Sequence, residues 1–89
     1  MRFDLGRVMT TPGALELLGV HKTTVASLLN RHIQGDWGDL DDEDVQTNND
    51  ALKLGNRILS SYKFPLGEKI WVITESDRSA TTLLLPEEY

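Results

Sequence analysis

The stretch that decides the fold is Arg57 to Pro86, which reads RILSSYKFPLGEKIWVITESDRSATTLLLP. It contains three short runs of apolar, β-branched or aromatic residues, at 57–64, 69–74 and 80–86, and two clusters of turn-forming residues separate them. This pattern is typical of an antiparallel meander, because β-branched and aromatic residues favour strands while Gly, Pro, Ser and Asp favour turns. The sequence therefore predicts three antiparallel strands in this part of the chain.

The second run is the most apolar of the three. Because side chains alternate between the faces of a strand, Ile70 and Val72 point to one face, and Trp71 and Ile73 point to the other. Both faces are apolar, which indicates the middle strand of the sheet. Pro86 ends the third run, since proline has no N–H to donate to a neighbouring strand.

The N-terminal part predicts a strand and a short helix. Arg2–Thr10 alternates loosely between apolar and polar residues and indicates a strand at an edge of the meander. Thr11 followed by Pro12 is typical of a helix start, because the hydroxyl caps the first turn and proline is tolerated at the first helical position. Gly19 is then expected to cap the end of this helix.

Two more helices are predicted before the meander. The second covers about Lys22–Ile33, has apolar residues at helical spacing, and ends at Gly35. The third begins after a cap at Asp39 or Asp41 and runs to Leu54, where Gly55 closes it.

The sequence thus predicts a single α+β domain, residues 1–89, in the order β-α-α-α-β-β-β. A three-to-four-stranded antiparallel sheet carries the helices on one face. The expected core members are Leu15, Leu18, Leu28, Leu29, Trp71 and Ile73.

The amino-acid composition excludes several kinds of functional site and cellular location. The chain has no cysteine, which excludes disulfides, a thiolate nucleophile and cysteine metal sites, and favours a reducing cytoplasm. No secretory segment is recognisable, and no apolar run approaches the roughly 18 residues of a membrane span. We expect a soluble cytoplasmic protein.

The formal net charge of −5 is concentrated in one segment. Residues 1–35 carry four basic and two acidic side chains, residues 51–89 carry five of each, and residues 36–50 carry seven acidic side chains and no basic one. A chain with this balance disfavours nonspecific binding to nucleic-acid phosphates, which depends on Lys and Arg.

The acidic segment is the first candidate site, as a surface for a basic protein partner. Its candidate residues are Asp36, Trp37, Asp39, Asp41, Asp42, Glu43 and Asp44. The structural alternative is a helix start, where a capping aspartate and first-turn acids favour the positive end of the helix dipole. Trp37 is either the hydrophobic anchor of the surface or a tryptophan tucked under the helix.

A calcium loop was compared with the same segment. Asp39, Asp41 and Glu43 have its alternating spacing. However, Asp44 stands where the loop requires glycine, and the twelfth position holds an aspartate, Asp50, where the loop has a glutamate. We therefore predict no metal site. The chain also contains no glycine-rich phosphate loop, no nucleophile elbow and no H-E-x-x-H motif, and we predict no catalytic or cofactor-binding residue.

The second candidate site is a helix-turn-helix-like unit at residues 14–33. A DNA-binding role would use His21, Lys22 and Arg31, the basic residues available there. The alternative is a helical hairpin packed on the sheet, which the adjoining acidic segment favours.

Three phrases carry a resemblance to a known family: GDWGDL at 35–40, RILS at 57–60, and WVITESDRSATT at 71–82 leading to LPEEY at 85–89. With them, the chain resembles a family of small uncharacterised proteins carried by bacterial plasmids, phages and other mobile elements. The resemblance covers most of the chain and implies an origin on a mobile element. Some relatives carry a label linking them to type I restriction, but 89 residues hold no methyltransferase motif.

The function expected from these observations is a non-enzymatic interaction protein that modulates a host defence or nucleic-acid-processing protein through its acidic segment. The alternative is a small DNA-binding regulator.

Overall fold

The structure is a computed structural model and describes residues 3–89. Within residues 3–89, three α-helices and four strands follow one another in the predicted order, so the α+β class and the element order are confirmed. The elements are β1 (Arg7–Thr10), α1 (Pro12–Val20), α2 (Val25–Ile33), α3 (Asp42–Leu54), β2 (Ile58–Lys63), β3 (Lys69–Thr74) and β4 (Ala80–Leu84), followed by a 3-10 helix (Pro86–Glu88). Arg2, part of the first predicted strand, lies outside the described residues.

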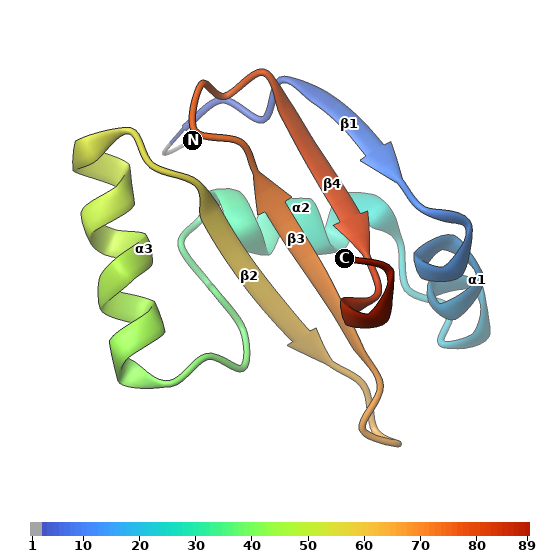
Figure 1. Cartoon of the computed structure of the whole chain (residues 1–89). Helices are drawn as coiled ribbons and strands as arrows, with labels where there is room; N and C mark the ends of the chain where they lie inside the picture. Colours follow the sequence, from blue (N-terminus) through green and yellow to red (C-terminus); the bar gives the residue numbers. More distant parts are fainter. Residues whose placement is uncertain (1–2) are drawn as a thin grey trace.

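The four strands form one sheet in the order β1-β4-β3-β2 (Figure 1). β3 pairs antiparallel with β2 and with β4, which confirms the meander and its middle strand. β1 joins the edge of the meander as expected, but it runs parallel to β4, so the sheet is mixed rather than purely antiparallel. No tight turn joins β1 to β4, and therefore local geometry does not force their directions to oppose.

One face of the sheet holds the main core. Figure 1 shows α2 behind the sheet, α1 near the β1 edge and α3 beside β2. Alternate residues of the strands meet α1 and α2 on this face, because the register places Tyr62 opposite Ile70 and Val72 opposite Leu83. The buried cluster consists of Ala14, Leu18, Leu28, Tyr62, Phe64, Ile70, Val72 and Leu83.

The expected core is confirmed at most of its members. Leu18, Leu28 and Ile73 are buried, and Leu29 packs half-buried against the main cluster. Leu15 was predicted wrongly, because it lies on the outer side of α1 with 59% of its surface exposed. Trp71 lies on the sheet face opposite α1 and α2 and is only half-buried, with the Tyr89 ring in edge-on contact at 5.9 Å between ring centres.

Side-chain caps set where the helices begin. The Thr11 hydroxyl accepts from Ala14 N, as predicted, and the Asp41 carboxylate accepts from Asp44 N at 2.8 Å. α2 begins at Val25, three residues later than predicted, because the Thr24 hydroxyl caps it by accepting from Ser27 N.

Left-handed residues mark two of the three helix ends as predicted. Gly35 and Gly55 have φ of 85° and 74° and follow α2 and α3. Gly19 was predicted wrongly as a cap, since it lies within α1 and the left-handed residue beyond this helix is Lys22, with φ of 53°. No helix within residues 3–89 is long and apolar enough to cross a membrane.

Candidate functional site

Four of the seven carboxylates between residues 36 and 50 interact with other groups of the chain. Asp36 pairs with Arg31, Asp39 lies 3.9 Å from the Lys69 ammonium, Asp41 caps α3, and Asp50 accepts from the Gln46 amide. Each of these four acids therefore has a partner in the chain, and Asp41 alone meets the capping requirement of α3.

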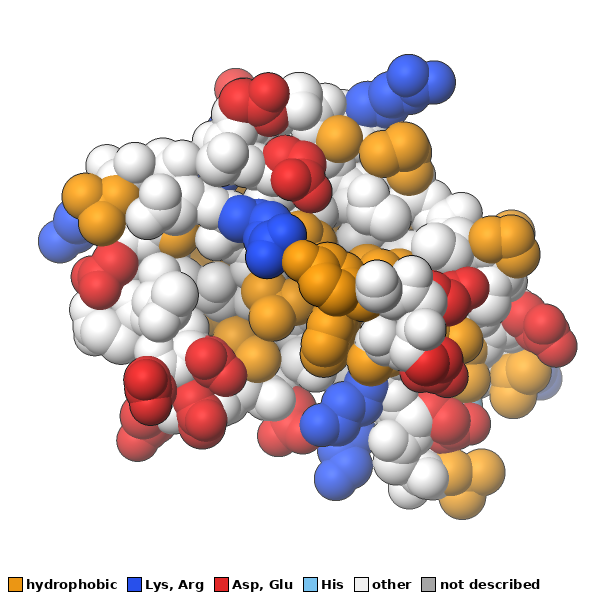
Figure 2. All heavy atoms as spheres, viewed as in Figure 1, with side chains coloured by type: hydrophobic (Ala, Val, Ile, Leu, Met, Phe, Trp, Pro, Cys, Tyr) orange, Lys and Arg blue, Asp and Glu red, His pale blue; other side chains and the backbone are white. Residues whose placement is uncertain are grey.

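The other three carboxylates, Asp42, Glu43 and Asp44, form the exposed first turn of α3. None of them has an ion-pair partner within residues 3–89. Figure 2 shows acidic side chains gathered at the lower left, where Figure 1 places the start of α3. We call these three residues the acidic turn. Its charges favour the helix dipole but repel one another, so it is the part of the segment that remains free to bind a partner.

Trp37 is tucked under α3. Only 4% of its surface is exposed, and it packs with Ala51 and Ile58 while its indole N–H donates to Asn49 Oδ1 at 3.3 Å. The hypothesis that Trp37 is the exposed anchor of a partner surface is therefore wrong. Its hydrophobic area serves a second core beside β2.

The calcium-loop residues do not converge. Asp41 is the cap of α3, while Asp50 lies more than two turns further along the helix. Within residues 3–89, no group of three or more His, Asp or Glu side chains is arranged to hold a metal ion.

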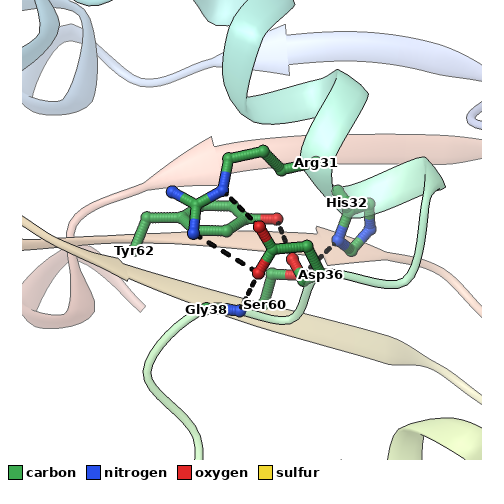
Figure 3. A network of polar contacts seen from close by, with 6 residues as sticks. All are labelled: Arg31, His32, Asp36, Gly38, Ser60 and Tyr62. Carbon is green, nitrogen blue, oxygen red and sulfur yellow. Dashed lines mark hydrogen bonds and ion pairs between the residues drawn. The ribbon is translucent and has the colours of Figure 1, made fainter.

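The end of α2 is held to the sheet by an exposed ion pair. Arg31 Nε donates to Asp36 Oδ2 at 2.7 Å, and the guanidinium lies 4.4 Å from the centre of the Tyr62 ring (Figure 3). The Tyr62 hydroxyl donates to Asp36 O at 2.7 Å. The hydrogen bond from Arg31 lowers the pKa of Asp36, and burial raises the pKa of Tyr62 to about 12. Arg31 and Asp36 therefore hold the chain turn after α2 in place.

The three residues of the DNA-binding alternative do not form a free basic surface. Arg31 is paired with Asp36, and the His21 ring stacks on Phe64 at 4.5 Å with its Nε2 3.5 Å from Glu68 Oε1. Lys22 is exposed and has no ion-pair partner in the part of the chain that the structure describes. One exposed lysine gives little attraction for a phosphate backbone.

His32 lies at the centre of a buried chain of polar groups that sequence reasoning missed. It is fully buried, with Nδ1 2.6 Å from Ser60 Oγ and Nε2 2.9 Å from Thr74 Oγ1. The chain continues from Thr74 to Thr81 at 2.7 Å, and the Thr81 hydroxyl donates to Leu5 O at 2.7 Å. Figure 3 shows the link from His32 on α2 to Ser60 on β2.

The hydrogen-bond chain assigns the tautomer of His32. Thr81 uses its one proton toward the Leu5 carbonyl, so Thr74 must donate to Thr81 and can only accept from His32. Nε2 therefore carries the proton, and Nδ1 of the neutral ring accepts from Ser60. Burial lowers the pKa of His32 from 6.5 to about 4, so the ring stays neutral at neutral pH.

A signal for this burial was present in the sequence. His32 follows Leu28 by four residues, which places it on the same face of α2 as a core leucine. Strand alternation likewise placed Ser60 on the face of Ile58 and Tyr62. Together, the two periodicities indicate a buried polar pair.

Several residues of the three segments that carry the family resemblance, 35–40, 57–60 and 71–89, have structural roles. A side chain at Gly38 would collide with the Ser61 carbonyl, where residues 37–39 pair with β2. Arg78 donates to Ala51 O and Asn56 O at the end of α3, and Glu88 accepts from Thr11 at 2.6 Å. These phrases therefore join distant elements of the fold.

No pocket is found in the part of the chain that the structure describes. Comparisons with models of known protein families, with curated proteins and with solved structures found no match for this chain.

Proposed function

We propose that this chain is a non-enzymatic interaction protein whose acidic turn, Asp42, Glu43 and Asp44, binds a basic surface on another protein. The observation that carries the proposal is the division of the acidic segment into four carboxylates that have a partner within residues 3–89 and three that have none there. Asp41 already caps α3, so three adjacent further charges exceed what the helix start requires. Their mutual repulsion lowers stability, and a basic partner would relieve it.

The kind of partner follows from charge complementarity. A row of carboxylates on one helical turn matches a basic groove, and such grooves are common on proteins that handle nucleic acids. The proposal therefore includes a host defence or nucleic-acid-processing protein as the target, and an origin of the chain on a plasmid, phage or other mobile element. DNA binding through His21, Lys22 and Arg31 is the alternative, and no observation of the fold favours it.

The test is capture of a partner from bacterial lysate with the parent chain and with Asp42→Asn/Glu43→Gln/Asp44→Asn. The matched control is Glu16→Gln/Glu75→Gln/Glu87→Gln, which removes three exposed carboxylates at dispersed positions that have no ion-pair partner within residues 3–89. We expect the first variant to lose the partner and the control to keep it. Association with the captured partner should also slow steeply with added salt for the parent, and much less for the first variant.

Equal capture by parent and first variant at low salt would show that the acidic turn is only a solvated helix start. A sequence-specific footprint on duplex DNA, weakened by Lys22→Ala, would support the alternative instead.

A further inference from the structure

β1 is an open edge of the sheet. It stands last in the strand order, and Figure 1 shows no element beyond it. Arg7 N donates to Ser79 O and Thr11 N donates to Leu83 O, so the odd-numbered residues direct their backbone groups toward β4. By strand alternation, the N–H and C=O groups of Val8 and Thr10 point away from the sheet. An edge of this kind is a template for pairing with another strand.

Exposed apolar side chains gather on the same part of the chain. Val8 and Met9 of β1 are 42% and 43% exposed, and Leu15 and Val20 of the following helix are more exposed still. These are four of the seven large apolar side chains that stand exposed within residues 3–89. The β1–α1 region therefore carries more than half of the exposed large apolar side chains of residues 3–89.

We propose that the β1 edge is a self-association surface, on which a second copy of the chain adds its own β1 antiparallel to the first, with Met9 on the twofold axis. In this register Val8 of each copy lies opposite Thr10 of the other. Both residues direct their backbone groups outward, so the two strands form four hydrogen bonds and a continuous eight-stranded sheet.

The ends of β1 exclude the neighbouring registers. A shift that places Val8 opposite Val8 would require Gly6 to pair with Thr10, but Gly6 has a φ of 65° and has left the strand conformation. A shift in the other direction would require Pro12 to donate, and proline has no N–H. The register centred on Met9 is therefore the one that uses both outward-facing residues of each strand.

Side-chain charge agrees with the same register. It places Arg7 opposite Thr11 of the second copy, and the Thr11 hydroxyl holds Glu88 by donating to Oε1 at 2.6 Å. Arg7 is exposed and has no ion-pair partner in the described part of its own chain. Each copy would thus bring its unpaired guanidinium beside a carboxylate of the other, twice about the axis.

The opposite edge of the sheet explains why assembly stops at two copies. Ser61 N donates to Trp37 O and Asp39 N donates to Ser61 O, so residues 37–39 cover the outer side of β2. Within residues 3–89 only the β1 edge remains open, and pairing like with like about a twofold axis closes the assembly. Because β1 has four residues, the interface is small and the dimer is expected to be weak.

Sedimentation of the parent between 10 µM and 1 mM tests self-association. We expect a reversible monomer–dimer equilibrium, weakened at least about tenfold by Met9→Lys and by Arg7→Glu at low salt. Leu66→Lys and Lys63→Glu are the matched controls, since these residues are exposed and lie away from β1, and both should dimerise like the parent. A parent that stays monomeric throughout this range, or that associates equally well with Met9→Lys, would overturn the proposal.

Disulfide trapping tests the register. The chain has no cysteine, so any disulfide of a Met9→Cys variant joins two copies; oxidised glutathione takes the two electrons as the two thiols couple. Facing residues of a non-hydrogen-bonded pair have Cβ atoms about 4.5–5.5 Å apart, so Met9→Cys should couple at least about tenfold faster than Leu66→Cys. Val8→Cys faces Thr10 instead and has the Val8 of the other copy on the diagonal about 7–8 Å away, so it should couple more slowly than Met9→Cys. Fastest coupling at Val8 would refute the register, and equal rates at all three positions would refute pairing at β1.

Discussion

Acidification should destabilise this protein through His32 before its carboxylates titrate. The neutral imidazole sits in a closed chain in which Ser60 donates to Nδ1 and Nε2–H donates to Thr74. A second proton on the ring would turn Nδ1 from an acceptor into a donor. It would also place a positive charge in a buried site where the contacts described above include no carboxylate. The folded protein therefore resists protonation that the unfolded chain accepts.

The sign and size of the effect follow from the lowered pKa. Between pH 6.5 and pH 4 the unfolded chain binds a proton at His32 that the folded protein does not, so stability is complete above 6.5 and falls as the pH decreases. The loss is about 2 kcal/mol at pH 5 and about 3 kcal/mol at pH 4, from 1.36 kcal/mol per pKa unit. A chain of this length has between about 4 and 13 kcal/mol of total stability, so the loss is a large part of it.

Urea unfolding between pH 7.5 and pH 4.5, followed by the fluorescence of the two tryptophans, measures this loss. His32→Gln should be less stable than the parent at pH 7.5 by about 1–3 kcal/mol, because Ser60 and Thr74 lose partners, and should show a much smaller pH dependence. The matched control is His21→Gln, which leaves His32 in place and should keep the dependence. A His32→Gln curve parallel to that of the parent would refute the reasoning.

Three further outcomes are expected. Trp37→Ala should lower the free energy of unfolding by about 3–5 kcal/mol, and Trp71→Ala by about 1–3 kcal/mol, because only Trp37 is fully buried. Equal losses of stability in chemical denaturation would contradict the assigned burial. Gly38→Ala should cost at least about 3 kcal/mol, against about 1–2 kcal/mol for Gly67→Ala, which has a similar left-handed φ but open space around it. Amide hydrogen exchange should be slowest in Ile70–Thr74, the strand paired on both sides. Faster exchange in this strand than in β1 would contradict the topology.

The sequence specified the order of the elements because each boundary has a local signal. Thr11, Asp41 and Gly55 act within one turn of their own position, and strand alternation in 57–86 assigned the faces of the meander. The direction of β1 had no such signal, since its partner β4 lies far along the chain and no turn joins them. Leu15 was misplaced for a related reason: α1 is apolar nearly all round, so its periodicity does not identify the face that packs.

The roles of the acidic residues could be predicted only in part. The cap at Asp41 follows from the sequence, because capping is local. The pairing of Asp36 with Arg31 depends on the turn at Gly35, and the burial of Trp37 depends on how α3 packs beside β2. Sequence therefore located the charge correctly but could not separate the carboxylates that hold the fold from the three that remain free.

Self-association through β1 would give the acidic turn a second copy at a fixed distance. The acidic turn lies beyond β2, at the opposite end of the sheet from β1. With strands about 4.8 Å apart and α3 about 10 Å beyond β2, the two acidic turns of a dimer lie on the order of 50 Å apart.

A partner with two basic sites at that spacing should bind the parent more tightly than it binds the Met9→Lys monomer, whereas a partner with one site should bind both equally. Titration of the captured partner with parent and Met9→Lys chains measures the difference, with each chain at a concentration above the dissociation constant of the parent dimer and below that of the variant. Tighter binding of the monomeric variant by either kind of partner would mean that β1 itself contacts the partner and that the two surfaces compete.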